Sequence, residues 1–206
     1  MTDGNAEEYA VVSSEVRFTG AIMTVRSDEV AMPDGGSAVR DYVVHPGAVG
    51  IVALDNEGRV LLLRQYRHPV RETLWELPAG LLDVAGEEPL VAARRELHEE
   101  GAVRAERWDL LIDAYTSPGG SDEAIRVFLA RDLSTVAAAD RFVGKAEEAG
   151  IELHWVGLDQ AVSWSLAGNV KNAMCVVGVL AAARARDLAW TPLRPADSAW
   201  AALSSG

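Results

Sequence analysis

The sequence predicts an α+β fold, in which mixed strands are covered by helices in an α/β/α sandwich. Two observations lead to this prediction: strand-like patterns fill the first third of the chain and return later, and helical patterns occur only in the middle and near the end. The chain has 206 residues, 49% of them hydrophobic, which is enough for one generous core. Strands and helices do not alternate regularly, so a doubly wound parallel sheet is not favoured.

The first third of the chain has the pattern of an antiparallel meander. The segments "YAVVSSEVRF", "AIMTVRSDEVAM" and "SAVRDYVVH" alternate β-branched with polar residues, and "MPDGG" is a turn signal. They predict a small sheet over residues 8 to 46. The pattern changes at Pro46-Gly47, so we predict an N-terminal sheet in residues 1–46 and a main domain in residues 47–206.

The main domain begins with two apolar runs, "AVGIVALD" and "RVLLLRQYR", whose connection through Asn56-Glu57-Gly58 predicts a buried hairpin. A helix is predicted over residues 89 to 100, because Pro89 suits a first helical turn and Gly101 a helix end. The remaining patterns predict strands at 107–115, 124–131 and 151–156, followed by helices at 158–167 and 170–186.

Composition narrows the class of protein. The net charge of −12 argues against a nucleic acid partner, since affinity for a polyanion depends on basic side chains. The single cysteine, Cys175, excludes an internal disulfide and fits a reducing compartment. The N-terminus lacks signal-peptide features, and the apolar run at residues 170–184 is too short to span a bilayer. We therefore expect a cytoplasmic protein with no membrane partner, in which Cys175 is unreactive.

An acidic cluster on the predicted helix needs an explanation. Glu96, Glu99 and Glu100 fall on one side of it, and each like-charge neighbour costs roughly 0.2–0.5 kcal/mol. A solvated helix face with mixed charges is one explanation. A divalent-cation site is the other, because carboxylate oxygens suit Mg²⁺ and Mn²⁺. The spacing alone does not decide between them.

The residues upstream favour the cation site. Gly80, Glu87 and the run Arg95-Glu96-Leu97-His98-Glu99-Glu100 resemble the Nudix box, a family motif that fixes several identities over about 23 positions. The chain departs from it twice. Six residues instead of five separate Gly80 from Glu87, which a loop can absorb. Ala102 replaces the usual glycine, and we expect Gly101 to supply the helix-ending turn.

The resemblance implies a Nudix fold and metal-dependent hydrolysis of a pyrophosphate. It implies Glu96 and Glu100 as the main ligands of Mg²⁺ or Mn²⁺, with Glu99 and the backbone carbonyl of Ala79 as further ligands. Arg95 and Glu87 would orient these acids, and Arg95 and Glu99 are also assigned to the catalytic set.

Segments outside the box resemble those of ADP-ribose and ADP-sugar pyrophosphatases: "RQYRHP", "LWELPAGLLD" and "SPGGSDE". The resemblance implies substrate contacts from Arg67, Trp75, Pro118 and Gly119. Taken singly, each segment has a simpler explanation, Arg67 as a surface strand residue and Pro118 as a turn former.

Members of this branch are commonly dimers that exchange the N-terminal sheet, so the resemblance implies a homodimer. Arg40 and Asp41 would then contact substrate, with Met23 or a neighbour against the base. The alternative is that these are ordinary strand residues.

The resemblance places the catalytic base at Glu147, in the polar loop "GKAEEAGIELHWV", with Glu148 as the alternative. Glu147 would take the proton of the attacking water. The expected reaction converts ADP-ribose to AMP and ribose 5-phosphate. Two alternatives are another nucleoside diphosphate sugar or dinucleotide as substrate, and a non-catalytic sensor that keeps the fold.

Overall fold

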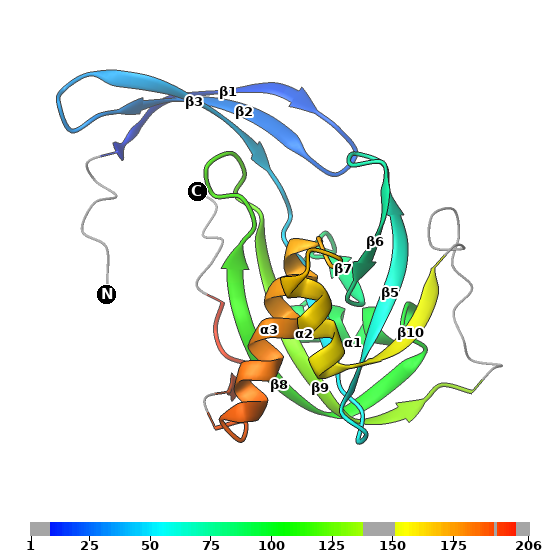
Figure 1. Cartoon of the computed structure of the whole chain (residues 1–206). Helices are drawn as coiled ribbons and strands as arrows, with labels where there is room; N and C mark the ends of the chain where they lie inside the picture. The colour runs from blue at the N-terminus through cyan, green and yellow to red at the C-terminus, as the bar shows by residue number, and fades with distance from the viewer. Residues whose placement is uncertain (1–8, 138–150, 192, 201–206) are drawn as a thin grey trace. The chain divides into compact units, whose positions relative to one another are not determined.

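Figure 1 shows the computed structural model, which describes residues 9–137, 151–191 and 193–200. The chain divides into two compact units. One comprises residues 1–47 and 115–124, and the other comprises residues 48–114 and 125–206. None of the helices in the described part of the chain has the length and hydropathy needed to span a membrane.

The first unit is built on a three-stranded antiparallel sheet, which confirms the predicted N-terminal sheet. Its strands are β1 (Val11–Thr19), β2 (Thr24–Ala31) and β3 (Ser37–Val44), in the order β1-β2-β3. The loop 115–124 belongs to this unit and not, as predicted, to the main domain. Its backbone pairs with Val43, whose N–H donates to Gly120 (2.9 Å) and whose carbonyl accepts from Asp122 (3.1 Å).

The second unit contains two sheets. The three-stranded sheet has the order β10 (Glu152–Gly157), β5 (Arg59–Arg67) and β6 (Glu72–Glu76), and all its pairs are antiparallel. The five-stranded sheet has the order β11 (Arg194–Pro195), β8 (Val103–Tyr115), β9 (Ala124–Thr135), β4 (Ala48–Ala53) and β7 (Ala79–Leu81). Strand β4 runs parallel to β9 and antiparallel to β7.

The predicted hairpin of the two apolar runs is wrong. Both runs form strands, β4 and β5, but the strands lie in different sheets, and antiparallel pairing between the runs is confined to the turn, with a bridge between Leu54 and Val60 and a hydrogen bond from the Asp55 N–H to the Arg59 carbonyl (2.9 Å). All six residues of β4 are buried. A strand is buried completely when it lies in the interior of a sheet that is covered on both faces. A parallel neighbour, β9, therefore takes the place that the prediction gave to β5.

Helices cover both faces of the five-stranded sheet, as the predicted α/β/α sandwich requires. Helix α1 (Pro89–Glu99) packs on Val49 and Ile51 of β4 through its buried residues Ala92, Ala93 and Leu97. Helices α2 (Leu158–Leu166) and α3 (Ala173–Asp187) contribute to the other core cluster, with Val52 of β4. Successive residues of β4 therefore pack against helices on opposite faces of the sheet.

Helix α1 begins as predicted but ends differently. Pro89 occupies its first turn. At the other end Gly101 does not have a positive φ; Ala102 does, at 51°. Gly101 is required for another reason, because a Cβ there would lie 2.7 Å from the Leu97 carbonyl oxygen. The expectation that Gly101 replaces the missing glycine of the turn is therefore wrong, and Ala102 carries the strain itself.

Replacing Ala102 with glycine should stabilise the protein. A left-handed conformation costs a residue with a Cβ roughly 1–2 kcal/mol, and glycine loses about 0.5–1 kcal/mol more backbone entropy on folding. The free energy of unfolding should therefore rise by about 0.5–1 kcal/mol in Ala102→Gly, measured by urea denaturation. Gly101→Ala is the matched comparison and should lower it; a loss of stability in Ala102→Gly would contradict the assignment of strain.

Candidate functional site

Arg95 is the centre of the acidic cluster on α1. Its guanidinium donates two hydrogen bonds to the Glu87 carboxylate (3.1 and 2.9 Å), and a further nitrogen pairs with Glu96 and, at 3.4 Å, with Glu99. These contacts raise the pKa of Arg95, chiefly through Glu87, and the hydrogen bonds from Arg95 lower the pKa of Glu87. One cation thus relieves the repulsion among three carboxylates.

Two glutamates of the cluster lie against the backbone of β7. Glu100 accepts a hydrogen bond from the Ala79 N–H (3.0 Å). The Glu96 carboxylate lies against Gly80, so closely that a Cβ at residue 80 would overlap it. With the Glu96 side chain in this position residue 80 has no room for a Cβ, and the two predicted main ligands meet the strand that carries the predicted carbonyl ligand.

These residues fit a divalent cation in their chemistry. Glu96 and Glu100 bring carboxylate oxygens to the Ala79–Gly80 backbone, and oxygen ligands suit Mg²⁺ and Mn²⁺. Within the described residues, however, no three acidic, histidine or cysteine side chains converge closely enough to hold a metal ion. Arg95 and the Ala79 N–H engage the carboxylates instead, so a cation would have to compete for them.

Arg67 at the end of β5 pairs with a glutamate that the sequence analysis missed. Its guanidinium donates to both oxygens of Glu76 (2.9 and 2.6 Å), whose side chain is only 3% exposed. This fork fixes the direction of Arg67 beside β6. The sequence does contain a signal for Glu76, because it is the single acid among the apolar residues of "LWELPAG".

Trp75 lies in a cluster of aromatic and basic side chains. Its ring lies 5.2 Å from that of Trp164 and 5.0 Å from that of His154, and the Arg64 guanidinium is 4.9 Å from its centre. It also packs on the core cluster to which α2 and α3 contribute. The role of Trp75 as a substrate contact stays a prediction.

Five residues predicted to contact substrate belong to the first unit. Arg40 and Asp41 are neighbours on β3 and therefore point to opposite faces of its sheet. Asp41 accepts a hydrogen bond from Ser27, and Arg40 donates to the Val39 carbonyl (3.1 Å). Pro118 and Gly119 lie in the loop 115–124, and Met23 is exposed.

Two other predicted residues are Glu147 and Cys175. Glu147, like its alternative Glu148, lies outside the described residues. Cys175 is fully buried in α3, and burial raises the pKa of its thiol to about 12. A neutral, inaccessible thiol is a poor nucleophile, which agrees with the expectation that Cys175 is unreactive.

Comparisons with known proteins identify the family. The model of the NUDIX domain matches residues 44–175. The chain is 43% identical to an ADP-ribose pyrophosphatase of Mycobacterium tuberculosis (strain ATCC 25618 / H37Rv), over 94% of this chain and 91% of the relative. It is 34% identical to a methanol dehydrogenase activator of Bacillus methanolicus, over 85% and 93% of the two chains.

A solved structure described as an ADP compounds hydrolase has the same fold. It matches with a TM-score of 0.75 and 19% sequence identity, over 88% of this chain and 96% of the other. The matched family region contains the whole cluster around Arg95 and strand β7, which Glu96 and Glu100 contact. The chain belongs to the Nudix family of hydrolases.

Proposed function

We propose that this protein hydrolyses the pyrophosphate bond of ADP-ribose to AMP and ribose 5-phosphate. The observation that carries the proposal is the placement of Glu96 and Glu100 against the Ala79–Gly80 backbone, with Arg95 holding the neighbouring acids. Such a group of oxygens is suited to a cation that faces phosphates. The names of relatives as ADP-ribose pyrophosphatases support the choice of substrate.

In the proposed reaction a water oxygen attacks one phosphorus of the pyrophosphate. The bond from that phosphorus to the bridging oxygen breaks, and the leaving phosphate keeps this oxygen. Glu147 takes the proton of the water, and Arg67, fixed in direction by Glu76, binds a phosphate oxygen. Mg²⁺ or Mn²⁺ held by Glu96, Glu99, Glu100 and the Ala79 carbonyl would neutralise phosphate charge and lower the pKa of the water.

The substrate test is an assay with Mg²⁺ and a panel of ADP-ribose, ADP-glucose, GDP-mannose, FAD and diadenosine polyphosphates. We expect the highest kcat/KM for ADP-ribose, with AMP and ribose 5-phosphate as products. Glu96→Gln should lower kcat/KM on the order of 100-fold, about 2.7 kcal/mol, and weaken Mn²⁺ binding measured by titration calorimetry.

Glu88→Gln is the matched control for Glu96→Gln. Glu88 carries the same side chain in the same motif, but it is exposed and makes no side-chain cap of α1. Its substitution should leave activity unchanged. Turnover of no compound in the panel, or equal activity of the two variants, would refute the proposed role of the cluster.

The assignment of the base is tested by Glu147→Gln and Glu148→Gln. Losing a general base costs roughly 10²–10⁴-fold in rate, so the first variant should lose that much kcat while the second keeps its activity. Circular dichroism spectra should be the same for both. The opposite result would move the base to Glu148.

We also propose that the protein is a homodimer that pairs through the first unit. Edge strand β1 is exposed along its whole length, and its surface includes Val12, Val16 and Phe18. Large exposed apolar side chains close together are typical of an interaction surface. A cytoplasmic location and the exclusion of nucleic acid stay predictions from the sequence.

Light scattering coupled to size exclusion should give the mass of a dimer for the native protein. Val16→Asp with Phe18→Asp should shift it toward the monomer, because a buried charge in an apolar interface costs several kcal/mol. Glu15→Gln, which adds no charge and removes no apolar side chain on the same exposed strand, is the comparison. A monomeric native protein would refute the proposed dimer.

A further inference from the structure

Arg126 is a buried cation that has no role in the proposed reaction. It is the third residue of β9, and only 2% of it is exposed. The strand registers place Gly80, Val49 and Arg126 in one row across β7, β4 and β9, so the Cα of Arg126 lies roughly 10 Å from that of Gly80. Neighbours in a row share a face, so the Arg126 side chain lies on the face that α1 covers. A buried charge is stable only where it is paired and hydrogen-bonded, so its partners indicate its task.

Two distant parts of the chain share the Arg126 guanidinium. The Asp113 carboxylate of β8 accepts two hydrogen bonds from it (2.8 and 3.2 Å). The backbone carbonyls of Ser198 and Ala199 accept two more (2.8 and 3.3 Å), and the centre of the Trp200 ring lies 5.1 Å from the guanidinium carbon. The C-terminal segment thus supplies as many hydrogen bonds to this buried charge as its carboxylate partner does.

The same segment is also tied at its start. Arg194 donates a hydrogen bond to Asp113 (2.9 Å), and its strand β11 pairs with β8. Ala196 then packs against the core cluster on which α1 lies. Residues 194–200 therefore begin and end on the ion pair of Asp113 with Arg126. We call this pair, together with residues 194–200, the C-terminal clamp.

The C-terminal clamp lies where the chain connects the two units. The chain crosses between them at residues 47–48, 114–115 and 124–125. The strands that carry these crossings are neighbours in the five-stranded sheet, in the order β8-β9-β4. Asp113 and Arg126 lie within two residues of the crossings on β8 and β9, and Val49, opposite Arg126, lies within two residues of the crossing on β4. The clamp therefore acts on all three connections.

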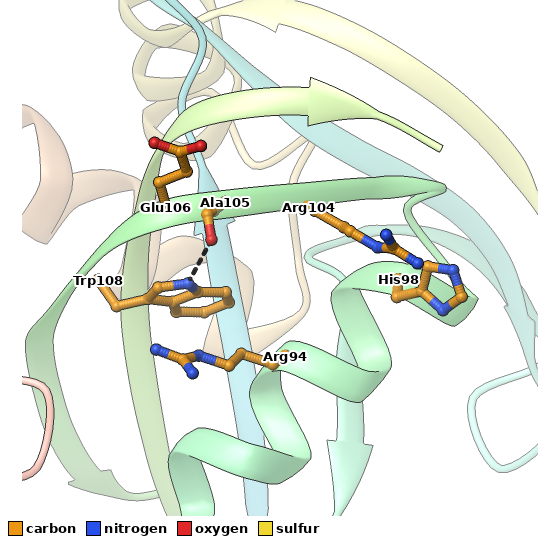
Figure 2. A pocket seen from close by; sticks show the side chains of 6 residues that line it. All are labelled: Arg94, His98, Arg104, Ala105, Glu106 and Trp108. Carbon is orange, nitrogen blue, oxygen red and sulfur yellow. Dashed lines mark hydrogen bonds between the residues drawn. The ribbon is translucent and has the colours of Figure 1, made fainter. Parts of the chain in front are cut away.

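The other end of β8 and β9 is held by apolar contacts. The ring of Trp108 lies 6.3 Å from that of Phe128, and both pack in the core cluster on which α1 lies. Figure 2 shows the pocket that Trp108 lines, where its indole N–H donates to the Ala105 carbonyl (3.0 Å). Apolar residues often hold buried positions as well as an ion pair does, so the charges of the clamp need an explanation besides stability.

The loop between β8 and β9 gives that explanation. It carries Pro118 and Gly119, two of the predicted substrate contacts, and others lie on β3 in the same unit. The ends of the loop are joined by Thr116, whose hydroxyl donates to the Glu123 carboxylate (2.5 Å) and whose N–H donates to the Glu123 carbonyl (3.1 Å). The clamp fixes the two strands from which this loop extends.

We propose that the C-terminal clamp positions the substrate contacts of the first unit for the reaction at the acidic cluster, with Arg126 as its positioning residue. This inference rests on the proposed function. The acids of α1 remain in place when the clamp is lost, whereas the substrate contacts lose their alignment. Loss of the clamp should therefore raise KM for ADP-ribose more than it lowers kcat.

The first test detaches the segment and leaves the buried ion pair intact. In the full chain, Arg194→Gln combined with Trp200→Ala should raise KM for ADP-ribose about tenfold and change kcat by less than about twofold. Mn²⁺ affinity, measured by titration calorimetry, should stay native. Hydrogen exchange, followed by mass spectrometry, should become faster in the loop 115–124 and stay unchanged in α1.

Conservative variants provide the controls. Arg194→Lys combined with Trp200→Phe keeps the charge and a ring over Arg126, so KM should stay native. The Trp200 indole N–H has no hydrogen-bond partner within the described part of the chain, so phenylalanine loses no bond there. Arg107→Gln, an exposed arginine of β8 outside the clamp, should also keep the native KM.

A second test removes the ion pair itself. Arg126→Gln combined with Asp113→Asn leaves no single buried charge and should raise KM at least as much as the first variant. If this variant does not fold, as judged by circular dichroism, the first variant decides alone. Native KM in the first variant, or a fall in its kcat with KM unchanged, would overturn the proposal.

Failure of the clamp and failure of the proposed function give different results. Turnover of no compound in the panel by native protein would refute the proposed function. The clamp is then tested by calorimetric titration of ADP-ribose in EDTA, where the first variant should bind about tenfold more weakly than native protein. Equal affinity of the two, or no saturable binding by native protein, would overturn the clamp.

Discussion

The contact on which the candidate site depends is the pairing of Arg95 with its surrounding carboxylates. Without a cation among them, Glu87, Glu96 and Glu99 would repel one another on one side of α1. A guanidinium suits this task better than an ammonium because it is planar and keeps its charge over the working pH range. Arg95 thus permits a high density of acid without unfolding the helix that carries it.

The position of this helix rests on a buried strand. The small side chains Ala92 and Ala93 let α1 approach β4 closely, and Leu97 fills the core cluster beside them. This docking sets the distance from the helix to β7, which is why Glu96 meets Gly80 and Glu100 meets Ala79. Core packing and the arrangement of the acids are therefore consequences of the same contact, and a change of volume beneath α1 would displace both.

Local features were predictable from the sequence and pairings between distant segments were not. The helix starting at Pro89 and the terminal helices follow from periodicity and from residues with strong positional preferences. The hairpin of β4 and β5 failed because an apolar run shows that a strand is buried without showing its neighbour. For the candidate site, the motif in the sequence was enough to predict the residues of the box. The ion pair of Arg67 with Glu76 was not predictable, because it depends on which strands are adjacent.

The parallel pairing of β4 with β9 has a consequence for the order of folding. Ala48 pairs with Ile125, so the strand beneath α1 gains its central neighbour only after the chain between them has been made. During synthesis the acidic helix would be complete before the sheet that supports it. Contacts of such wide sequence separation form slowly, because the loop-closure entropy must be lost before they contribute. The residues of the box thus reach their final positions late, when β9 pairs with β4.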